Sequence, residues 1–482
     1  MRILFISPNR QTFVHPVPPL GMLYIAAGAK KHGHEVKVLD LMFKKRIGKL
    51  VEEAVREFSP ELVGVSIRNV DTLFSKSRFD VPDIKECVDT VRQMSSAPII
   101  LGGSAFSIFP KELMETLSAD FGIAGEADEA FPLFLSKWSK REDISDIPGL
   151  VQHTGNTWII NPPQKVENLD AIPFQAIEDI DWKSYGRYRG NFGVFTRKGC
   201  PLDCIYCPEA PIHGHKPRLR SPKRSVDEIE HIIDVTRLPW FDFADTLFNA
   251  PREHAVNVCE ELIKRHVPIK YEVELNPVGQ DEESVKLLKA SGCIGVDLTA
   301  DSGSNSMLEN LRKGYTREML LKTAELYFKH NIPYTVGFIL GGPGENVTTL
   351  KETLNLADNL PGGATSYFAV GIRVFRGTEL ERIYCLDKTA SGSLLPLNFY
   401  LSPDFDETCI RLLMKAYRRN FRIHLCDLMY EGASAFALKM ADFWNIRPLW
   451  STGRTLRIFD FVFNGGKIAF KWDKESCQFV KD

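Results

Sequence analysis

Short apolar runs alternate with amphipathic segments over the first 145 residues of the chain. The apolar runs cover residues 3–6, 36–39, 62–67, 98–101 and 121–124. Residues 21–31 and 49–58 have the spacing of amphipathic helices. Continuous apolar strands separated by helices are typical of a parallel sheet with helices on both faces. The pattern therefore predicts an α/β fold that begins with a doubly wound domain over residues 1–145.

Proline and glycine interrupt this pattern in the next stretch of the chain. Pro148, Gly149, Pro162, Pro163 and Pro173 fall within it, and no regular apolar spacing accompanies them. Such residues favour turns and loops over helices and strands. We expect a linker over residues 146–184.

The strand and helix alternation returns from residue 193 onward. Further strand patterns cover residues 194–196, 240–243, 269–274, 295–298, 334–340 and 367–374, and helical patterns such as 282–290 and 317–330 lie between them. These repeating units fall short of a complete (β/α)8 barrel, so we expect a partial (β/α)6 barrel over residues 185–395. Residues 406–425 then look helical, and aromatic residues follow. A small, mostly helical C-terminal domain over residues 396–482 is expected.

Composition and charge narrow the class of protein. The chain has 482 residues, of which 44% are hydrophobic and 25% charged, and its net charge is −2. A near-neutral balance gives no reason to expect nucleic acid or a membrane surface as partner. The apolar run at the N-terminus is too short for a signal peptide, and no stretch is apolar enough to span a bilayer. We expect a monomeric cytoplasmic protein.

Three of the ten cysteines crowd into one short segment: Cys200, Cys204 and Cys207. The other seven are scattered, unlike the dense framework of a small secreted protein. Thiolates are the ligands that iron–sulfur clusters require. Three of them on one loop can hold three irons of a 4Fe–4S cluster and leave the fourth iron open. A zinc site completed by His213 or His215 is the alternative.

The spacing C-x3-C-x2-C, with Tyr206 before the last cysteine, resembles that of the radical S-adenosylmethionine (SAM) family. The resemblance extends over about residues 185–395 through an acidic strand end and two glycine-rich segments. It implies that the open iron binds SAM, whose reductive cleavage gives methionine and a 5′-deoxyadenosyl radical. The residues it implies at the SAM site are Tyr206, Asp245, Asp301, Ser302, Arg312 and Gly341. Asp301 stands where the family commonly has a longer glutamate.

Small residues follow the strands of the first domain, where a doubly wound sheet binds its ligand. No phosphate-binding glycine loop is present. These segments resemble a cobalamin-binding domain over residues 1–145. The residues that the resemblance places near cobalamin are Pro8, Asn9, Leu20, Gly21, Tyr24, Ser66, Arg68, Asn69, Gly102, Gly103, Ser104, Gly125 and Glu126. The D-x-H-x-x-G motif is absent around His15, which implies cobalamin without a histidine below cobalt, where Arg68 could discourage axial water.

Together the two resemblances imply a cobalamin-dependent radical SAM methyltransferase. Its 5′-deoxyadenosyl radical and methylcobalamin would methylate an unactivated sp3 carbon. The carbon would lie on a small molecule or a peptide or protein side chain, such as a residue of methyl-coenzyme M reductase, with Phe399, Trp444 and Trp450 near it. The electron donor would be a flavodoxin or ferredoxin. A cyclase, ring-contracting enzyme or oxidase without net methylation is an alternative, and a non-catalytic cobalamin or iron–sulfur sensor is another. No catalytic side chain is assigned from the sequence.

Overall fold

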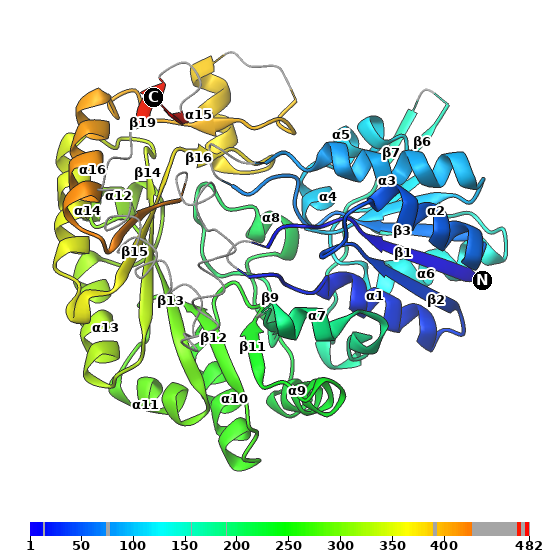
Figure 1. Ribbon diagram of the computed structural model, residues 1–482, viewed down its shortest axis with the longest axis horizontal. Helices are drawn as coiled ribbons and strands as arrows, with labels where there is room; N and C mark the ends of the chain where they lie inside the picture. The colour runs from blue at the N-terminus through cyan, green and yellow to red at the C-terminus, as the bar shows by residue number, and fades with distance from the viewer. Residues whose placement is uncertain are drawn as a thin grey trace.

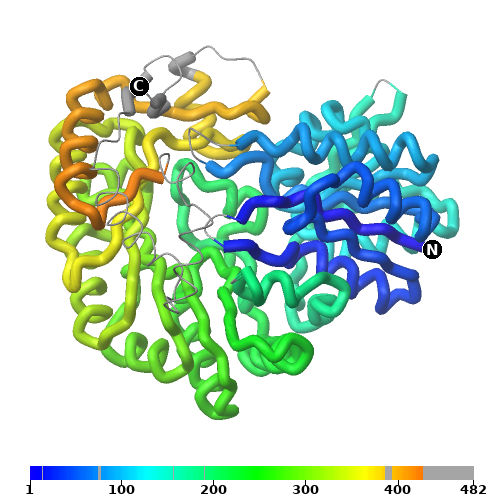
Figure 2. Tube along the Cα trace, in the orientation of Figure 1, coloured from blue at the N-terminus to red at the C-terminus, as the bar shows by residue number. Residues whose placement is uncertain are grey.

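Two α/β lobes lie side by side in the computed structural model (Figure 1). It describes residues 1–12, 15–73, 78–155, 157–188, 190–388 and 393–426, together with the strand pair β19 (Phe470–Asp473) and β20 (Gln478–Lys481). The tube in Figure 2 follows the chain from the blue and cyan first lobe into the green to orange second lobe. The α/β class expected from the sequence is confirmed.

The first lobe is built on a seven-stranded sheet in the order β2-β1-β3-β4-β5-β6-β7. Its strands are β1 (Arg2–Ser7), β2 (Glu35–Asp40), β3 (Leu62–Ser66), β4 (Ile99–Gly102), β5 (Phe121–Ile123), β6 (Leu150–Thr154) and β7 (Thr157–Ile160). Its helices are α1 (Leu20–Lys31), α2 (Ile47–Phe58), α3 (Val81–Met94), α4 (Ser104–Ile108), α5 (Pro110–Leu117) and α6 (Ala127–Ser139). The first five strands run parallel, as the apolar runs predicted.

Alternation along β1 shows why helices cover both faces of this sheet. Ile3 and Phe5 pack with residues of α1 and α6 on one face. Leu4 and Ile6 pack with residues of α2, α3 and α5 on the other. Successive side chains of a strand point to opposite faces, so an unbroken apolar strand needs cover on each.

The segment expected to be a linker contains two strands of the first sheet. β6 and β7 pair with each other and β6 pairs with β5, in both cases antiparallel. The hairpin is half exposed and its strands are short, so its apolar pattern is weak among the neighbouring prolines. The true connection follows it and contains η1 (Leu169–Ala171), η2 (Ile177–Asp179) and α7 (Trp182–Arg187).

The second lobe is a curved parallel sheet in the order β18-β15-β14-β13-β12-β11-β8. The strands are β8 (Phe192–Val194), β11 (Trp240–Phe243), β12 (Lys270–Leu275), β13 (Cys293–Asp301), β14 (Tyr334–Leu340), β15 (Thr365–Val370) and β18 (Ile423–Leu425). The helices are α8 (Glu209–His213), α9 (Pro222–Thr236), α10 (Arg252–Lys264), α11 (Glu282–Ala290), α12 (Asn305–Asn310), α13 (Arg317–Lys329), α14 (Val347–Asp358), α15 (Glu379–Lys388) and α16 (Glu407–Arg419). Figure 1 shows α10, α11, α13, α14 and α16 on the outer side of the sheet.

Smaller elements complete this lobe. They are η3 (Pro361–Gly363) and the two-residue strands β9 (Arg197–Lys198), β10 (Arg218–Leu219), β16 (Ile372–Arg373) and β17 (Phe399–Tyr400). β9 and β10 pair as a short antiparallel ribbon. This ribbon encloses the cysteine loop (residues 199–207) and α8, which lie between its two strands in the sequence.

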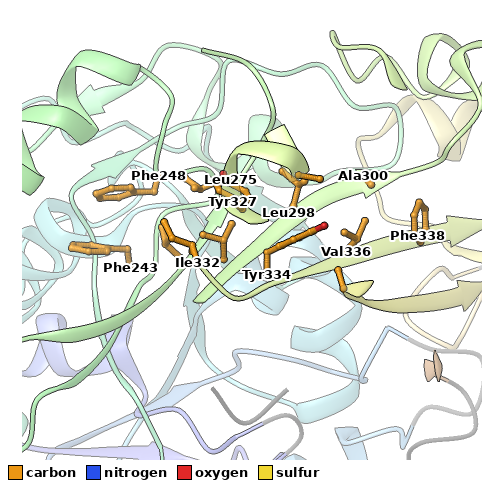
Figure 3. Packing of buried hydrophobic residues seen from close by; sticks show 14 of the residues in the cluster. Phe243, Phe248, Leu275, Leu298, Ala300, Tyr327, Ile332, Tyr334, Val336 and Phe338 are labelled. Atoms are coloured by element: carbon orange, nitrogen blue, oxygen red, sulfur yellow. The ribbon is translucent and has the colours of Figure 1, made fainter. Parts of the chain in front are cut away.

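The start of the expected C-terminal domain belongs to the barrel. Helix α16 packs on the barrel core, and β18 adds a seventh strand beside β15. The helix expected over residues 406–425 therefore ends early, because Ile423 and Leu425 are buried as strand residues. Phe243, Phe248 and Leu298 lie in the same core (Figure 3). The rest of that expected domain lies outside the described residues, apart from β19 and β20.

Candidate functional site

A cavity of about 880 Å³ lies between the two lobes, at the carboxyl ends of strands from both sheets. The first lobe lines it with most of the residues predicted to contact cobalamin. These are Asn9, Leu20, Gly21, Tyr24, Ser66, Arg68, Gly102, Gly103, Ser104, Gly125 and Glu126. Pro8 and Asn69 are not in the lining, and the amide of Asn69 donates a hydrogen bond to Gln11 instead (2.9 Å). The strand ends thus converge as the parallel sheet requires.

Two glycines of this lining occupy positions that a side chain would fill. Gly103 has a φ of 104°, and a Cβ there would lie 2.5 Å from the carbonyl oxygen of Ile67. Gly125 has a φ of 84°, and its Cβ would lie 2.5 Å from Cβ of Pro163. Only glycine adopts this backbone without strain. The bare backbone at the cavity wall suits the close approach of a large, flat ligand.

His15 points away from the first sheet and toward the barrel. Its Nε2 lies 2.8 Å from Oδ2 of Asp242 on β11. Burial lowers the pKa of His15, but the charge of Asp242 and the hydrogen bond to it outweigh burial, so the pKa is raised. Arg68 also lines the cavity, and it has no ion-pair partner among the described residues. Burial lowers the pKa of its guanidinium.

Glu126 connects the first lobe to the segment after the cysteine loop. Its carboxylate is fully buried and accepts hydrogen bonds from Nη1 of Arg218 (2.7 Å) and from the backbone N–H of Val166 (2.8 Å). His213 Nδ1 lies 2.9 Å from its Oε1. Burial raises the pKa of Glu126, but these hydrogen bonds reverse the effect and lower it well below 4.5. The residue predicted to contact cobalamin therefore also joins the two lobes.

The cysteine loop carries three free thiols in a constrained backbone. Gly199, with a φ of 92°, precedes them, and a Cβ there would lie 2.7 Å from the carbonyl oxygen of Lys216. The N–H of Cys200 donates to the carbonyl of Gly214 (3.0 Å). Burial raises the pKa of Cys207 to about 12, so a positive metal centre would be needed to hold it as a thiolate. Three soft donors on one loop fit a cluster.

The two histidines that could complete a zinc site are placed differently. His213 Nδ1 is hydrogen bonded to Glu126. His215 is exposed.

Asp245 lines the cavity and holds the strand that leads into the cysteine loop. Its Oδ1 accepts hydrogen bonds from the backbone N–H of Thr196 (2.8 Å) and Arg197 (3.1 Å), and its Oδ2 accepts one from the Thr196 hydroxyl (2.6 Å). The side chain is 4% exposed. The predicted SAM contact of Asp245 remains a prediction, and the structure adds this positioning of the loop.

The other residues predicted at the SAM site do not line the cavity. Ser302 is buried, with its hydroxyl 3.1 Å from that of Thr353. Gly341 has a φ of 86°, and its N–H donates to Glu345. Arg312 is half exposed and forms an ion pair with Asp203 (3.0 Å) at the surface.

A buried cation beside the cysteine loop was missed by sequence reasoning. Lys313, next to Arg312, is 4% exposed, and its Nζ lies 2.7 Å from Oδ2 of Asp301 and 3.1 Å from the hydroxyl of Tyr206. The Tyr206 hydroxyl also donates to Asp301. Arg312 and Lys313 are adjacent in the sequence, which does not indicate which of the two side chains is buried.

Four carboxylates on neighbouring barrel strands were also missed. Asp242, Glu272, Glu274 and Asp297 line the cavity, and the strand register places Asp242 beside Glu272 and Glu274 beside Asp297. Burial, with the charge of Asp297, raises the pKa of Glu274 to about 8, and burial raises that of Asp297 to about 6. Charged residues alternating with buried ones in these strands were the available signal.

Of the three aromatic residues expected near the substrate, Phe399 lies in the described part of the chain. Phe399 lies on β17, paired with β16, and is not in the cavity lining. Trp444 and Trp450 lie outside the described residues.

Comparison with known families matches each lobe separately. Residues 6–135 match the B12 binding domain, and residues 194–357 match the Radical SAM superfamily. The chain combines a B12 binding domain with a Radical SAM domain. The two matched segments contain most of the residues that line the cavity and all three clustered cysteines.

Its relatives include several methyltransferases. An uncharacterized methyltransferase of Pyrococcus horikoshii is 23% identical over 369 residues, which cover 75% of this chain and 78% of the relative. The tryptophan 2-C-methyltransferase of Streptomyces laurentii is 24% identical over 438 residues, covering 77% and 72%. In both cases the similarity includes most of each protein.

Solved structures share the arrangement of the whole chain. The radical SAM methyltransferase TsrM from Kitasatospora setae, with tryptophan and a SAM analogue bound, superposes with a TM-score of 0.85 at 23% identity, covering 96% of this chain and 99% of TsrM. The cobalamin-dependent radical enzyme OxsB, with aqua-cobalamin bound, gives 0.72 at 17% identity, covering 98% and 74%. At these identities the likeness establishes the common fold.

Proposed function

We propose that this chain is a cobalamin-dependent radical SAM methyltransferase. The observation that carries the proposal is a shared cavity, which the strand ends of the B12-binding lobe and of the radical SAM barrel line together. Methyl transfer through two cofactors requires both to reach one substrate. Two separate pockets would not serve it.

Each side of the cavity fits one cofactor. Cys200, Cys204 and Cys207 would hold a 4Fe–4S cluster, and the glycine-lined strand ends of the first lobe would hold cobalamin. When bound, cluster, SAM and cobalamin together supply a 5′-deoxyadenosyl radical and a transferable methyl group. A low-potential flavodoxin or ferredoxin would supply the electron.

The described side chains position these groups. Asp245 fixes the entry of the cysteine loop through the backbone N–H groups of Thr196 and Arg197. Glu126 fixes its exit through Arg218 and His213. The Nε2 atom of His15 is directed at Asp242 on the barrel, which supports cobalamin bound without a histidine ligand from this loop. Arg68, which lines the cavity, would be among the residues that face cobalamin.

The proposed acceptor is an unactivated sp3 carbon of a peptide or protein side chain, such as a residue of methyl-coenzyme M reductase, or of a small molecule. Such a carbon has no useful acidity, so removal of a hydrogen atom by the radical is the fitting way to activate it. The barrel carboxylates would face the substrate from the side opposite the first lobe.

Product analysis with labelled SAM tests the proposal. Anaerobically reconstituted protein and its substrate, given SAM with a deuterated methyl group, should add three deuterons to a product carbon after bound methyl groups have turned over. S-adenosylhomocysteine and 5′-deoxyadenosine should form in near-equal amounts. Cys200→Ala, Cys204→Ala and Cys207→Ala should each abolish both the cluster and 5′-deoxyadenosine. A triple variant that keeps both would refute the proposal.

Cyclisation is the second candidate, and specific relatives favour it. The anaerobic magnesium-protoporphyrin IX monomethyl ester cyclase of Rubrivivax gelatinosus is 25% identical over 375 residues, covering 74% of this chain and 65% of the relative. A product that gains no methyl mass while substrate still stimulates 5′-deoxyadenosine formation would decide for cyclisation or oxidation. No 5′-deoxyadenosine from reduced protein with a full cluster would instead indicate a sensor.

A further inference from the structure

The ammonium group of Lys313 lies in a closed environment beneath the cysteine loop. Besides Asp301 and the Tyr206 hydroxyl, its neighbours are aromatic: Nζ is 5.6 Å from the ring centre of Tyr206 and 5.8 Å from that of Tyr315. Its side chain is 4% exposed. A lysine this buried carries a desolvation cost that only specific partners offset.

Backbone contacts fix this cation to the cysteine loop. The N–H of Ile205, between Cys204 and Tyr206, donates to the carbonyl of Leu311 (3.3 Å), two residues before Lys313. Tyr206 itself lies between Cys204 and Cys207 and contacts Lys313 directly. The turn after α12 and the cysteine loop therefore form one packed unit.

Two opposite charges of this unit lie beside the middle cysteine. Lys313 and Asp301 both contact the hydroxyl of Tyr206, which follows Cys204 by two residues. The two charges therefore act on this part of the cysteine loop with opposite signs. Because the pair is buried, solvent and salt screen these effects little.

We infer that Lys313 raises the reduction potential of the cluster held by Cys204, and that Asp301 lowers it. Reduction adds one negative charge to the cluster, which a fixed cation stabilises and a fixed anion destabilises. Net charge and hydrogen bonding around the sulfurs are the levers by which proteins set cluster potentials. Lys313 is therefore a positioning residue for charge, which acts through Cys204. The inference depends on the proposed function only because both require a 4Fe–4S cluster at the three cysteines.

Redox titration of the cluster tests the inference without any catalytic turnover. The full chain with its cofactors, but without SAM, is poised at set potentials, and the paramagnetic signal of the reduced cluster is measured. Lys313→Met should lower the ratio of reduced to oxidised cluster at a given potential at least tenfold, which is 59 mV for one electron. Asp301→Asn should raise the ratio, and Lys313→Arg should restore most of it.

Arg312→Met is the matched control. It removes an exposed cation from the same turn, where water screens its charge. The ratio of reduced to oxidised cluster at a given potential should therefore stay within about threefold of that in the unaltered protein. Unchanged potentials in Lys313→Met and Asp301→Asn, or shifts of the same sign, would overturn the inference. If Lys313→Met takes up no cluster, Asp301→Asn decides alone: a rise supports the inference and any other result overturns it. Absence of a cluster from the unaltered protein would instead refute the proposed function.

Discussion

At the scale of single residues, two buried carboxylates position the chain on either side of the cysteine loop. Both oxygens of the Asp245 carboxylate accept hydrogen bonds from the start of the cysteine loop. The carboxylate of Glu126 accepts hydrogen bonds from the segment after that loop. Both side chains are almost completely buried. Hydrogen bonds to charged acceptors are stronger than neutral ones, so each carboxylate holds backbone that would otherwise be free to shift.

Asp245→Asn should show that loop position controls SAM cleavage. The amide keeps the shape but loses the charge and one acceptor, which leaves the Thr196 hydroxyl or a backbone N–H less well bound. We expect 5′-deoxyadenosine formation to fall at least about tenfold, equivalent to roughly 1.4 kcal/mol, with cobalamin binding unchanged. Asp234→Asn, an exposed change on α9, is the control. An equal loss of cobalamin would contradict this role.

At the scale of elements, the loop after β1 reaches from the first lobe to the barrel through His15. Because His15 Nε2 is engaged with Asp242, we expect this histidine not to bind cobalt. Cob(II)alamin bound to the protein should give an electron paramagnetic resonance spectrum without coupling to a nitrogen ligand, in both the unaltered protein and His15→Ala. Single-nitrogen splitting that disappears in His15→Ala would show that the loop moves to bind cobalt.

Regular elements were predictable where a strand is buried on both faces. The runs at β1, β3 and β14 are continuous and apolar, and their order implies a parallel sheet. The hairpin of β6 and β7 was not predicted, because one face of an edge hairpin is exposed to solvent and its pattern of apolar residues is short. β18 escaped because its burial depends on β15, far away in sequence.

The site residues also divide into those that the sequence predicts and those that depend on the three-dimensional structure. The cysteines stand in a local spacing that defines the chemistry, and the glycines follow strands, so both could be read from the chain. Lys313 and Asp242 could not, because their importance comes from which way a turn or strand faces in three dimensions. Sequence alone favoured Arg312, whose side chain the structure places at the surface.

At the scale of the whole molecule, buried ionic contacts join the lobes. Arg373 of the barrel lobe lies 3.0 Å from Asp71 of the first lobe, and neither side chain is more than 2% exposed. Glu126 pairs with Arg218, and the Tyr24 hydroxyl donates to Glu228 (3.0 Å).

In the described residues no helix is long and apolar enough to cross a membrane.

Glu126→Gln should weaken this junction in a pH-dependent manner. The folded pKa of Glu126 lies below its ordinary 4.5, so its carboxylate stabilises the fold fully above about pH 5 and progressively less as pH falls. Removing one partner of a buried pair costs roughly 3–5 kcal/mol. The variant should melt several degrees lower at pH 7, and the difference should narrow toward pH 3. Exposed Glu129→Gln should match the unaltered protein, whereas a constant difference at every pH would contradict the assignment.

The buried pairs across the boundary also bear on how such proteins can diversify. If a lobe were exchanged for that of a relative, Asp71 or Glu126 would lose the arginine with which it forms an ion pair. An unpaired buried charge destabilises the fold. Recombination that joins lobes from different ancestors should therefore succeed only when both halves of each pair travel together. New substrates are then reached more easily by changing the barrel wall than by exchanging whole modules.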